Sequence, residues 1–409
     1  MKKRVIVIGG GAAGMMAAGT AAARGLSVKL IEQNRILGKK LLITGKGRCN
    51  VTNACDNVQD LIENVTQNRT FLYSAFYGFT NSQTMAFFES MGVPLKTERG
   101  DRVFPVSDRS ADIVDALKRF LIQNHVTILH DRVDDILTEN GKVCGVKTLH
   151  NEKVEAESVI LATGGLSYQQ TGSTGDGYTW AENLGHTVTE LFPSLVPLRV
   201  EENWITNVSG LSLKNIALTV FNGKNKKVYT DFGEMMFAHF GLTGPVILSA
   251  SAHMRNMRQD TYRICIDLKP ALEDRHLDQR ICRDFQKNMN KEFKNSLKDL
   301  LPSGLIPEMV ALSQIDPYKK VNAVTREERR RLVSLLKNLE FHVTGFCPID
   351  QAIVTAGGVC VKEIDPSTME SKIVPGLFFA GEVIDVDAYT GGFNLQIAFS
   401  TGHLAGSCC

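Results

Sequence analysis

The sequence predicts an α/β fold in which a Rossmann-like dinucleotide-binding domain is interrupted by an inserted antiparallel β domain and a helical subdomain. Residues 4–32 follow the order strand, glycine turn, helix, strand. Short strand-like runs separated by turn residues fill 191–270, as in an antiparallel sheet. The chain then becomes helical and strongly charged, and the strand-and-glycine character of the first part returns near Phe346. We therefore expect a discontinuous nucleotide domain at 1–190 and 345–409, a β-rich substrate domain at 191–270 and a helical subdomain at 271–344.

The opening segment carries the G-x-G-x-x-G pattern at Gly9, Gly11 and Gly14. A β-rich apolar run precedes the pattern, an alanine-rich helix follows it, and a second strand ends at Glu32. In this context Gly9 permits a tight turn, Gly11 lets the backbone approach a pyrophosphate, and Gly14 lets the helix pack on the sheet. Glu32 is placed to accept hydrogen bonds from ribose hydroxyls. The motif by itself serves either FAD or NAD.

Composition narrows the possible partners. The net charge of +2 over 409 residues gives no global attraction to nucleic acid or to a membrane, so we expect a small-molecule substrate instead. The nine cysteines show no C-x-x-C spacing, which indicates reduced thiols and no metal site. The first apolar run is too short for a signal peptide, and no stretch reaches the roughly 18 apolar residues of a membrane helix. These observations predict a cytoplasmic protein, and they leave the oligomeric state open.

Three later stretches decide between the two dinucleotides: 38–53, 161–165 and 381–396. With the first glycine motif, they resemble the bacterial flavoprotein family that includes the bile-acid reductase BaiN and aminoacetone oxidase. The resemblance covers essentially the whole chain. Its specific marks are L-I-T-G-K-G-R-C-N-V-T-N at 42–53, F-P-S-L-V-P-L at 192–198, G-E-M-M-F-A-H-F-G-L-T-G-P at 233–245, T-A-G-G-V at 355–359 and L-F-F-A-G-E-V-I-D-V-D-A-Y-T-G-G-F-N-L-Q at 377–396.

The resemblance implies an FAD-binding domain of the two-dinucleotide flavoprotein type, with Glu382 where the family's motif usually has Asp. Val133 would contact adenine through its backbone, unless it is an ordinary strand valine. The apolar run that starts at Asn394 is compatible with a helix whose N-terminus faces the flavin pyrimidine and stabilises its negative charge on reduction. The residues expected to bind FAD are Gly9, Gly11, Ala12, Ala13, Gly14, Glu32, Gln33, Lys40, Thr44, Gly45, Gly47, Arg48, Cys49, Asn50, Val133, Ala162, Thr163, Gly164, Gly381, Glu382, Asp385, Gly392, Phe393, Asn394 and Leu395.

Two residues are candidates for proton transfer to or from a substrate. His239 lies in a turn-rich part of the insertion, and Tyr389 lies beside a pair of glycines. Each could instead have a purely structural role. Cys49 has no partner at C-x-x-C spacing, so packing explains it better than redox chemistry.

The resemblance favours an FAD-dependent oxidoreductase in which NAD(P)H reduces the flavin and flavin N5 passes hydride to an activated C=C, as in a 3-oxo-Δ4 steroid or bile acid. Because only one G-x-G-x-x-G is convincing, NAD(P)H would bind transiently and without a domain of its own. One alternative is an amine oxidase that passes electrons to O2, like aminoacetone oxidase. Another is a non-catalytic or RNA-associated flavoprotein. The basic cluster at 326–331 is interpreted as a solvated helix face because acidic residues are interleaved with it.

Overall fold

The computed structural model describes residues 2–150, 153–257 and 261–409. The chain divides into two compact units. Unit 1 combines Met1–Ser194 with Pro348–Cys409, and unit 2 is Leu195–Cys347. The predicted fold class is confirmed, because unit 1 contains a parallel sheet with helices, and unit 2 contains an antiparallel barrel with helical elements. The division of the insertion at 270/271 stays a prediction.

Unit 1 is built around a five-stranded parallel sheet in the order β19-β10-β1-β2-β6. The central strand β1 is apolar and almost fully buried, as expected for a parallel strand covered on both faces. The last strand in sequence, β19, pairs with β10, so the end of the chain completes a sheet that its beginning starts. The strands are β1 (Arg4–Ile8), β2 (Ser27–Ile31), β6 (Thr127–Leu129), β10 (Ser158–Leu161) and β19 (Leu377–Phe379).

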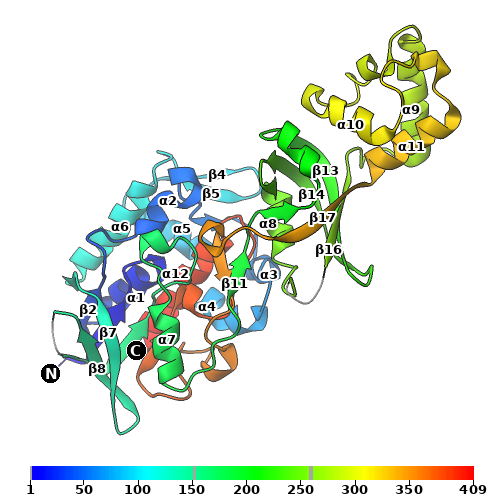
Figure 1. The fold of residues 1–409 in the computed structure, drawn as a ribbon. Helices are drawn as coiled ribbons and strands as arrows, with labels where there is room; N and C mark the ends of the chain where they lie inside the picture. The colour runs from blue at the N-terminus through cyan, green and yellow to red at the C-terminus, as the bar shows by residue number, and fades with distance from the viewer. Residues whose placement is uncertain (1, 151–152, 258–260) are drawn as a thin grey trace. The chain divides into compact units, whose positions relative to one another are not determined.

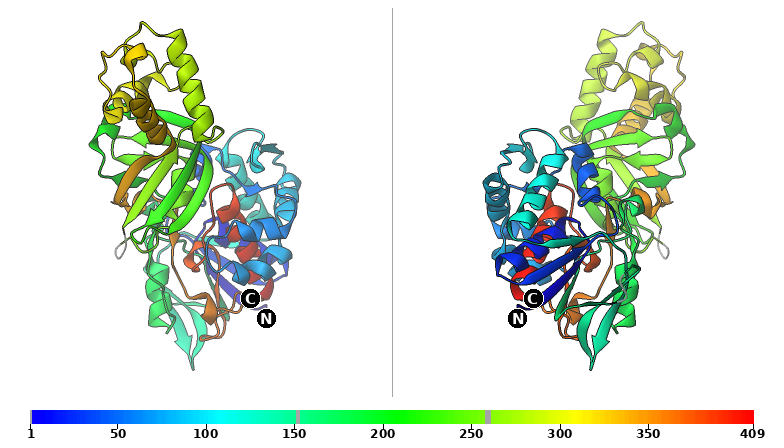
Figure 2. Two further views of the ribbon diagram at one scale, coloured as in Figure 1. Left: turned by 90° about the vertical axis from the view of Figure 1, so that its right-hand side faces the viewer. Right: turned by 90° about the vertical axis from the view of Figure 1, so that its left-hand side faces the viewer.

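Two helices from opposite ends of the sequence pack together in unit 1: α1 (Ala12–Ala23) and α12 (Phe393–Cys408). Figures 1 and 2 show α12, in red, against α1, in blue. Glycines on α12 make the close approach possible. A Cβ at Gly402 would overlap the Ala13 carbonyl oxygen. This contact holds the C-terminal helix beside the first glycine turn.

The remaining elements of unit 1 surround the sheet. The segment 57–125 is mainly helical, but it also contains the hairpin β4–β5, which pairs with β3. An antiparallel three-stranded sheet, β7-β8-β9, follows β6. These elements are α2 (Lys39–Gly47), β3 (Thr52–Asn53), α3 (Val58–Glu63), α4 (Tyr73–Gly78), α5 (Asn81–Ser90), β4 (Leu95–Glu98), β5 (Arg102–Pro105), α6 (Ser110–Gln123), β7 (Val133–Glu139), β8 (Lys142–Thr148), β9 (Val154–Glu155), α7 (Asp176–Asn183), β11 (Phe192–Ser194) and β18 (Val354–Ala356).

Unit 2 contains a closed six-stranded barrel in the order β12-β15-β14-β13-β16-β17. The helices between β16 and β17 pack with the barrel around one apolar core. The predicted helical subdomain at 271–344 ends in a strand from Leu339 onward, because β17 pairs with both β12 and β16 to close the barrel. The elements are β12 (Leu198–Val200), β13 (Ser212–Asn222), β14 (Lys227–Ala238), β15 (Gly241–Thr243), α8 (Pro245–Ser251), β16 (Tyr262–Asp267), α9 (Asp274–Lys287), α10 (Ile306–Ser313), α11 (Arg326–Lys337) and β17 (Leu339–Phe346). Within the described parts of both units, every helix is too short or too polar to span a lipid bilayer.

Candidate functional site

A cavity of about 360 Å³ lies in unit 1, where the parallel strands end. Its walls come from the turn after β1, the end of β2, α2, the loops after β10 and β19, and the start of α12. Ligands of open α/β sheets bind at this carboxyl edge of the strands. All of the lining residues belong to unit 1.

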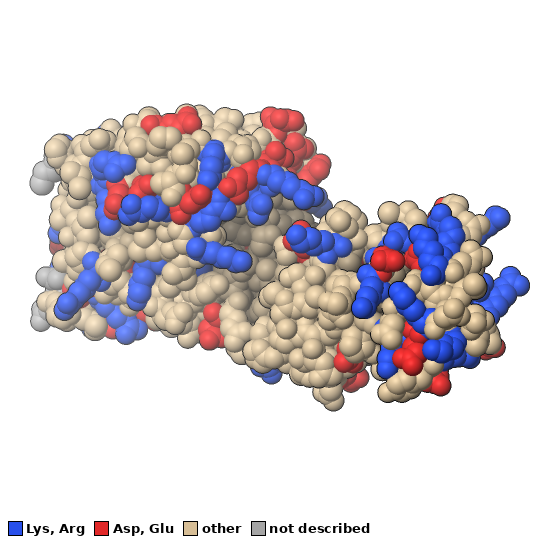
Figure 3. All heavy atoms as spheres, turned by 90° about the horizontal axis from the view of Figure 1, so that it is seen from above, with Lys and Arg blue, Asp and Glu red and all other residues tan. Residues whose placement is uncertain are grey.

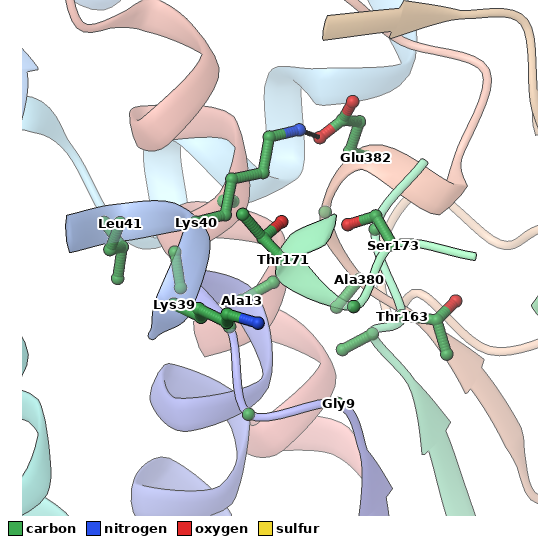
Figure 4. A pocket seen from close by; sticks show the side chains of 18 of the residues that line it. Gly9, Ala13, Lys39, Lys40, Leu41, Thr163, Thr171, Ser173, Ala380 and Glu382 are labelled. Carbon is green, nitrogen blue, oxygen red and sulfur yellow. Dashed lines mark hydrogen bonds and ion pairs between the residues drawn. The ribbon is translucent and has the colours of Figure 1, made fainter. Parts of the chain in front are cut away.

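The glycine turn after β1 shapes one wall of this cavity (Figure 4). Gly9 has a φ of 103°, and a Cβ there would collide with the backbone of Ala162. A Cβ at Gly14 would overlap the Gly9 carbonyl oxygen, so this glycine seats α1 against the turn. A Cβ at Gly11 would have no neighbour within 4 Å among the described residues. Gly11 caps α1 without a side-chain hydrogen bond, which leaves the first N–H groups of the helix available to an anion.

Glu32, at the end of β2, is buried and already holds the turn in place. Its Oε2 accepts a hydrogen bond from Gly10 N at 2.7 Å, and its Oε1 accepts from Asn34 N at 2.8 Å and Asn34 Nδ2 at 2.7 Å. Asn34 Nδ2 also donates to the Thr171 carbonyl at 3.0 Å. The carboxylate therefore ties the glycine turn to the loop after β10, in addition to any contact with a ribose.

An ion pair closes another side of the cavity, as Figure 4 shows. Lys40 Nζ donates to Glu382 Oε2 at 2.7 Å and to Ser167 Oγ at 2.8 Å. Glu382 Oε1 accepts from Thr355 N and Ser167 Oγ, both at 2.9 Å. The network joins α2, the loop after β10, β18 and the loop after β19, so it fixes four separate segments around one space.

Two buried polar atoms at the cavity lack a hydrogen-bond partner among the described residues: Asn50 Oδ1 and Thr163 Oγ1. Both residues line the cavity. Buried polar groups without a partner are rare in native proteins and cost free energy. A polar ligand that bonds to these atoms would remove that cost, so the cavity fits an extended polar cofactor such as a dinucleotide.

The start of α12 forms the wall that the resemblance assigns to the flavin. Gly392 caps the helix with a φ of 100°, and a Cβ there would overlap the backbone of Thr52. Asn394 uses its side chain on the protein itself: its Oδ1 accepts from Ala388 N, and its Nδ2 donates to the carbonyls of Ala388 and Tyr389. The side chain therefore shapes the loop. The first backbone N–H groups of α12, at residues that line the cavity, have no partner within the helix.

Most residues predicted to bind the cofactor line this cavity, although their contact with FAD stays a prediction. The predicted residues that line it are Gly9, Gly11, Ala12, Ala13, Glu32, Gln33, Lys40, Thr44, Gly45, Asn50, Val133, Ala162, Thr163, Gly164, Gly381, Glu382, Gly392, Asn394 and Leu395. Tyr389, predicted as a proton donor, lines it too.

Other predicted residues are absent from the described lining and have different contacts. Arg48 pairs with Glu98 and Asp108, and its guanidinium lies 4.1 Å from the centre of the Phe104 ring. Cys49 is fully buried, and burial raises its pKa to about 12, so it is a neutral thiol. The remaining members of this group are Gly14, Gly47, Asp385 and Phe393, of which Gly14 seats α1 and Asp385 and Phe393 are buried.

His239 lies in unit 2, in the turn between β14 and β15, where it is exposed. Its ring packs edge-on against Phe240 with ring centres 5.0 Å apart. No described contact assigns His239 to a substrate, and its catalytic role stays a prediction.

Sequence reasoning missed one whole wall of the cavity, the segment 171–176 after β10. Gln33 Nε2 donates to the Gly172 carbonyl at 2.7 Å, and Lys39 Nζ donates to the Gln170 carbonyl at 2.6 Å. These hydrogen bonds hold residues 170–172 close to the chain that follows β2. Its glycines, Gly172 and Gly175, both adopt left-handed backbone conformations and were the available signal. Lys39, Trp180, Ile353 and Val354 were missed as well.

Comparisons with known proteins agree with this geometry. The family model described as "HI0933-like protein Rossmann domain" matches residues 3–408. A 3-dehydro-bile acid delta(4,6)-reductase from Clostridium scindens is 30% identical over 408 residues, which is 98% of each chain. A ribosomal RNA dihydrouridine synthase from Haemophilus influenzae is 30% identical over 403 residues, which is 97% of this chain and 96% of the relative. A solved 3-ketosteroid delta1-dehydrogenase from Sterolibacterium denitrificans shares the fold, with a TM-score of 0.53 at 14% identity and 99% coverage of both chains. Unit 1 is thus a Rossmann-type domain, as predicted.

Proposed function

The chain belongs to the HI0933-like Rossmann-domain family, and from this premise we propose that it is an NAD(P)H-driven, FAD-dependent reductase of an activated C=C. The observation that carries the proposal is the chemistry shared by two relatives with different substrates. A Δ4 bond beside a 3-oxo group and the C5=C6 bond of a uracil ring are both C=C bonds conjugated to a carbonyl. The names of the reductase and of the dihydrouridine synthase both describe the saturation of such a bond. The leading substrate class is a 3-oxo-Δ4 steroid or bile acid.

When bound, FAD supplies the redox chemistry, which here is hydride uptake from NAD(P)H and hydride delivery to the conjugated carbon. The chain supplies charge, position and protons. The N-terminus of α12, which lines the cavity, would stabilise negative charge on the bound flavin as it is reduced. The Lys40–Glu382 pair and its hydrogen bonds hold four segments of the cavity wall in fixed positions. Saturation of C=C also needs a proton at the neighbouring carbon, and we assign Tyr389, which lines the cavity, as its donor.

Anaerobic mixing tests this proposal directly. NADH or NADPH should bleach the flavin absorbance, and a 3-oxo-Δ4 bile acid added afterwards should restore it. Tyr389→Phe should leave the bleaching intact and slow the recovery by about 10²–10⁴-fold, because only the second step needs the proton. Tyr73→Phe, which removes the hydroxyl of an exposed tyrosine, is the matched control and should behave as wild type. If neither nicotinamide bleaches the flavin, the proposal is wrong.

The second candidate substrate is a uridine in ribosomal RNA, favoured by the dihydrouridine synthase that matches this chain over nearly its full length. The two candidate substrates are distinguished by adding each one to the protein whose flavin has been reduced by NAD(P)H. Protein-free ribosomal RNA from cells without this gene should restore the absorbance and gain dihydrouridine, detected by mass spectrometry, if RNA is the substrate. Recovery with the bile acid alone would reject RNA as the substrate.

A further inference from the structure

Positive charge is distributed unevenly along this chain. Residues 271–337, which contain α9, α10 and α11, hold 14 Lys and Arg against 10 Asp and Glu, a net charge of +4. The whole chain carries only +2, so the rest of it is slightly acidic. Figure 3 shows Lys and Arg side chains gathered over the helical part of unit 2, at the right of the view. The balanced total, from which we predicted no nucleic-acid partner, therefore conceals a locally basic segment.

Helix α9 concentrates this charge on one face. Its buried apolar residues repeat every four positions, so they occupy a single stripe that faces the core of unit 2. Basic residues on the opposite side are separated by four, three and four positions, which also places them on one face. At 1.5 Å per residue this basic stripe is about 16 Å long. It consists of His276, Arg280, Arg283 and Lys287.

The charges of this stripe are only partly neutralised. Arg283 and Lys287 are exposed, and neither forms an ion pair with a described residue. Arg280 donates to the Asp299 carbonyl at 3.0 Å, and its Nε lies 3.6 Å from Asp284 Oδ2. That carboxylate oxygen is buried and has no hydrogen-bond partner among the described residues. Two cations of the stripe are thus free to meet an external anion.

The free cations line a surface hollow, and the segment that follows α9 contacts an exposed aromatic ring. The hollow is lined by Arg280, Arg283, Asp284, Gln286 and Lys287. Beyond the end of α9, Val321 N donates to the Lys291 carbonyl at 3.0 Å and Lys294 N to the Pro317 carbonyl at 3.1 Å, which joins the segment after α9 to 317–321. Lys294 Nζ lies 3.9 Å from the centre of the Tyr318 ring, and Tyr318 is 66% exposed. Cations beside an exposed aromatic ring are the combination that binds single-stranded nucleic acid, through phosphates and a stacked base.

We propose that this face of unit 2, formed by the α9 stripe and Tyr318, binds RNA. Arg283 and Lys287 contact phosphates, and Tyr318 stacks on an unpaired base. On the other charged helix, α11, Arg329 is paired with Asp278 and acidic residues fill part of the first turn, although Arg326 and Arg330 are exposed there as well. The choice of RNA over other polyanions rests on the second candidate substrate of the proposed function, whereas binding itself requires no reduction.

The test is a binding titration of the full-length holoprotein against a fluorescein-labelled fragment of large-subunit ribosomal RNA, followed by fluorescence anisotropy at several salt concentrations. Each phosphate contact to a single strand contributes about 0.7 to the slope of log affinity against log salt. Arg283→Gln/Lys287→Gln should therefore lower the slope by about 1.4 and weaken binding at least about fivefold. Tyr318→Ala should weaken binding without changing the slope.

The matched control is Arg326→Gln/Arg330→Gln on α11. It removes the same charge at the same spacing, from exposed arginines that form no ion pair with a described residue. RNA binding by this control should stay within about twofold of wild type, because the stripe is untouched. Equal weakening by both double variants would mean that RNA responds to the total positive charge of these helices and not to the α9 stripe, which would overturn the proposal. Absence of binding at low salt would do the same.

Two further outcomes concern the partner and the proposed function. If vesicles of phosphatidylglycerol bind in the same α9-dependent way and RNA does not, the partner is a membrane surface, and the proposal of RNA is wrong. The same protein samples are assayed for flavin bleaching by NAD(P)H and recovery with a bile acid. If the wild-type protein shows flavin turnover but no RNA binding, this inference alone is wrong. If it binds RNA but shows no turnover, the proposed function alone is wrong.

Discussion

Replacing Gly11 by alanine should separate the stability of unit 1 from its affinity for FAD. Gly11 has a φ of −81° and a ψ of −168°, a conformation that alanine adopts without strain. A Cβ at this position meets no described atom within 4 Å. The new methyl group would therefore project into the cavity, where the pyrophosphate is expected to approach the start of α1.

The expected magnitudes differ for the two properties. Alanine caps a helix slightly worse than glycine does, by several tenths of a kcal/mol, and it restricts the unfolded chain by about 0.4–1 kcal/mol. These effects nearly cancel, so the free energy of unfolding of the apoprotein should stay within about 0.5 kcal/mol of wild type. Displacing the pyrophosphate by the width of a methyl group loses at least one charge-assisted hydrogen bond, about 1.5–3 kcal/mol. FAD affinity should then fall about 10- to 100-fold.

The assay is a fluorescence titration of the apoprotein with FAD, paired with urea unfolding of the same apoprotein. Gly14→Ala is the contrasting variant, because its Cβ would overlap the Gly9 carbonyl oxygen and destabilise the fold itself. If Gly11→Ala binds FAD as tightly as wild type at unchanged stability, the pyrophosphate does not lie against this turn, and the reasoning fails.

Three further outcomes are expected. Because burial raises the pKa of Cys49 to about 12, its thiol should resist iodoacetamide in the folded protein and react only in denaturant; labelling of Cys49 in native protein, read by peptide mass spectrometry, would contradict this. Gly402→Ala should cost about 1–3 kcal/mol in urea unfolding, since its Cβ would overlap the Ala13 carbonyl, whereas Gly78→Ala, with open space around its Cβ, should cost less than about 0.5 kcal/mol. Burial lowers the pKa of His403 below its usual value of about 6.5, so its neutral form stabilises the fold above that pH and this contribution is lost as the pH falls toward the folded pKa. The unfolding free energy of His403→Gln should accordingly decline less between neutrality and about pH 5.5 than that of wild type, and an equal decline would show that His403 is not the group responsible.

Local spacing made much of unit 1 predictable. The glycine turn, the strand before it and the acid at the end of the next strand lie within a short stretch of sequence, so their geometry follows from neighbouring residues. The apolar run after Gly392 forms a helix for the same reason, and that helix is α12. Between 57 and 125, in contrast, the hairpin β4–β5 was missed, because strand pairing depends on residues that periodicity does not reveal.

The tertiary contacts of individual side chains were the least predictable part of the site. Arg48 sits in a stretch that resembles a flavin-binding segment, yet Glu98 and Asp108, far away in sequence, hold its guanidinium. Trp180 reaches the cavity from a helix that carries no recognisable motif. Both facts follow from tertiary packing, which brings distant segments together and which a single sequence does not display.

The dependence of the sheet on β19 and of the cavity on α12 has a consequence for synthesis on the ribosome. Unit 2 is one continuous segment and has its own apolar core, so it can fold as soon as residue 347 has emerged. The first 194 residues must wait for 377–408, about 10–40 s later than their own synthesis at 5–20 residues per second. During that interval Gly9 and Glu32 are present, but the wall that α12 provides is not. A chain that stops early therefore cannot complete the cavity. The cofactor can bind only after nearly the whole chain has been synthesised.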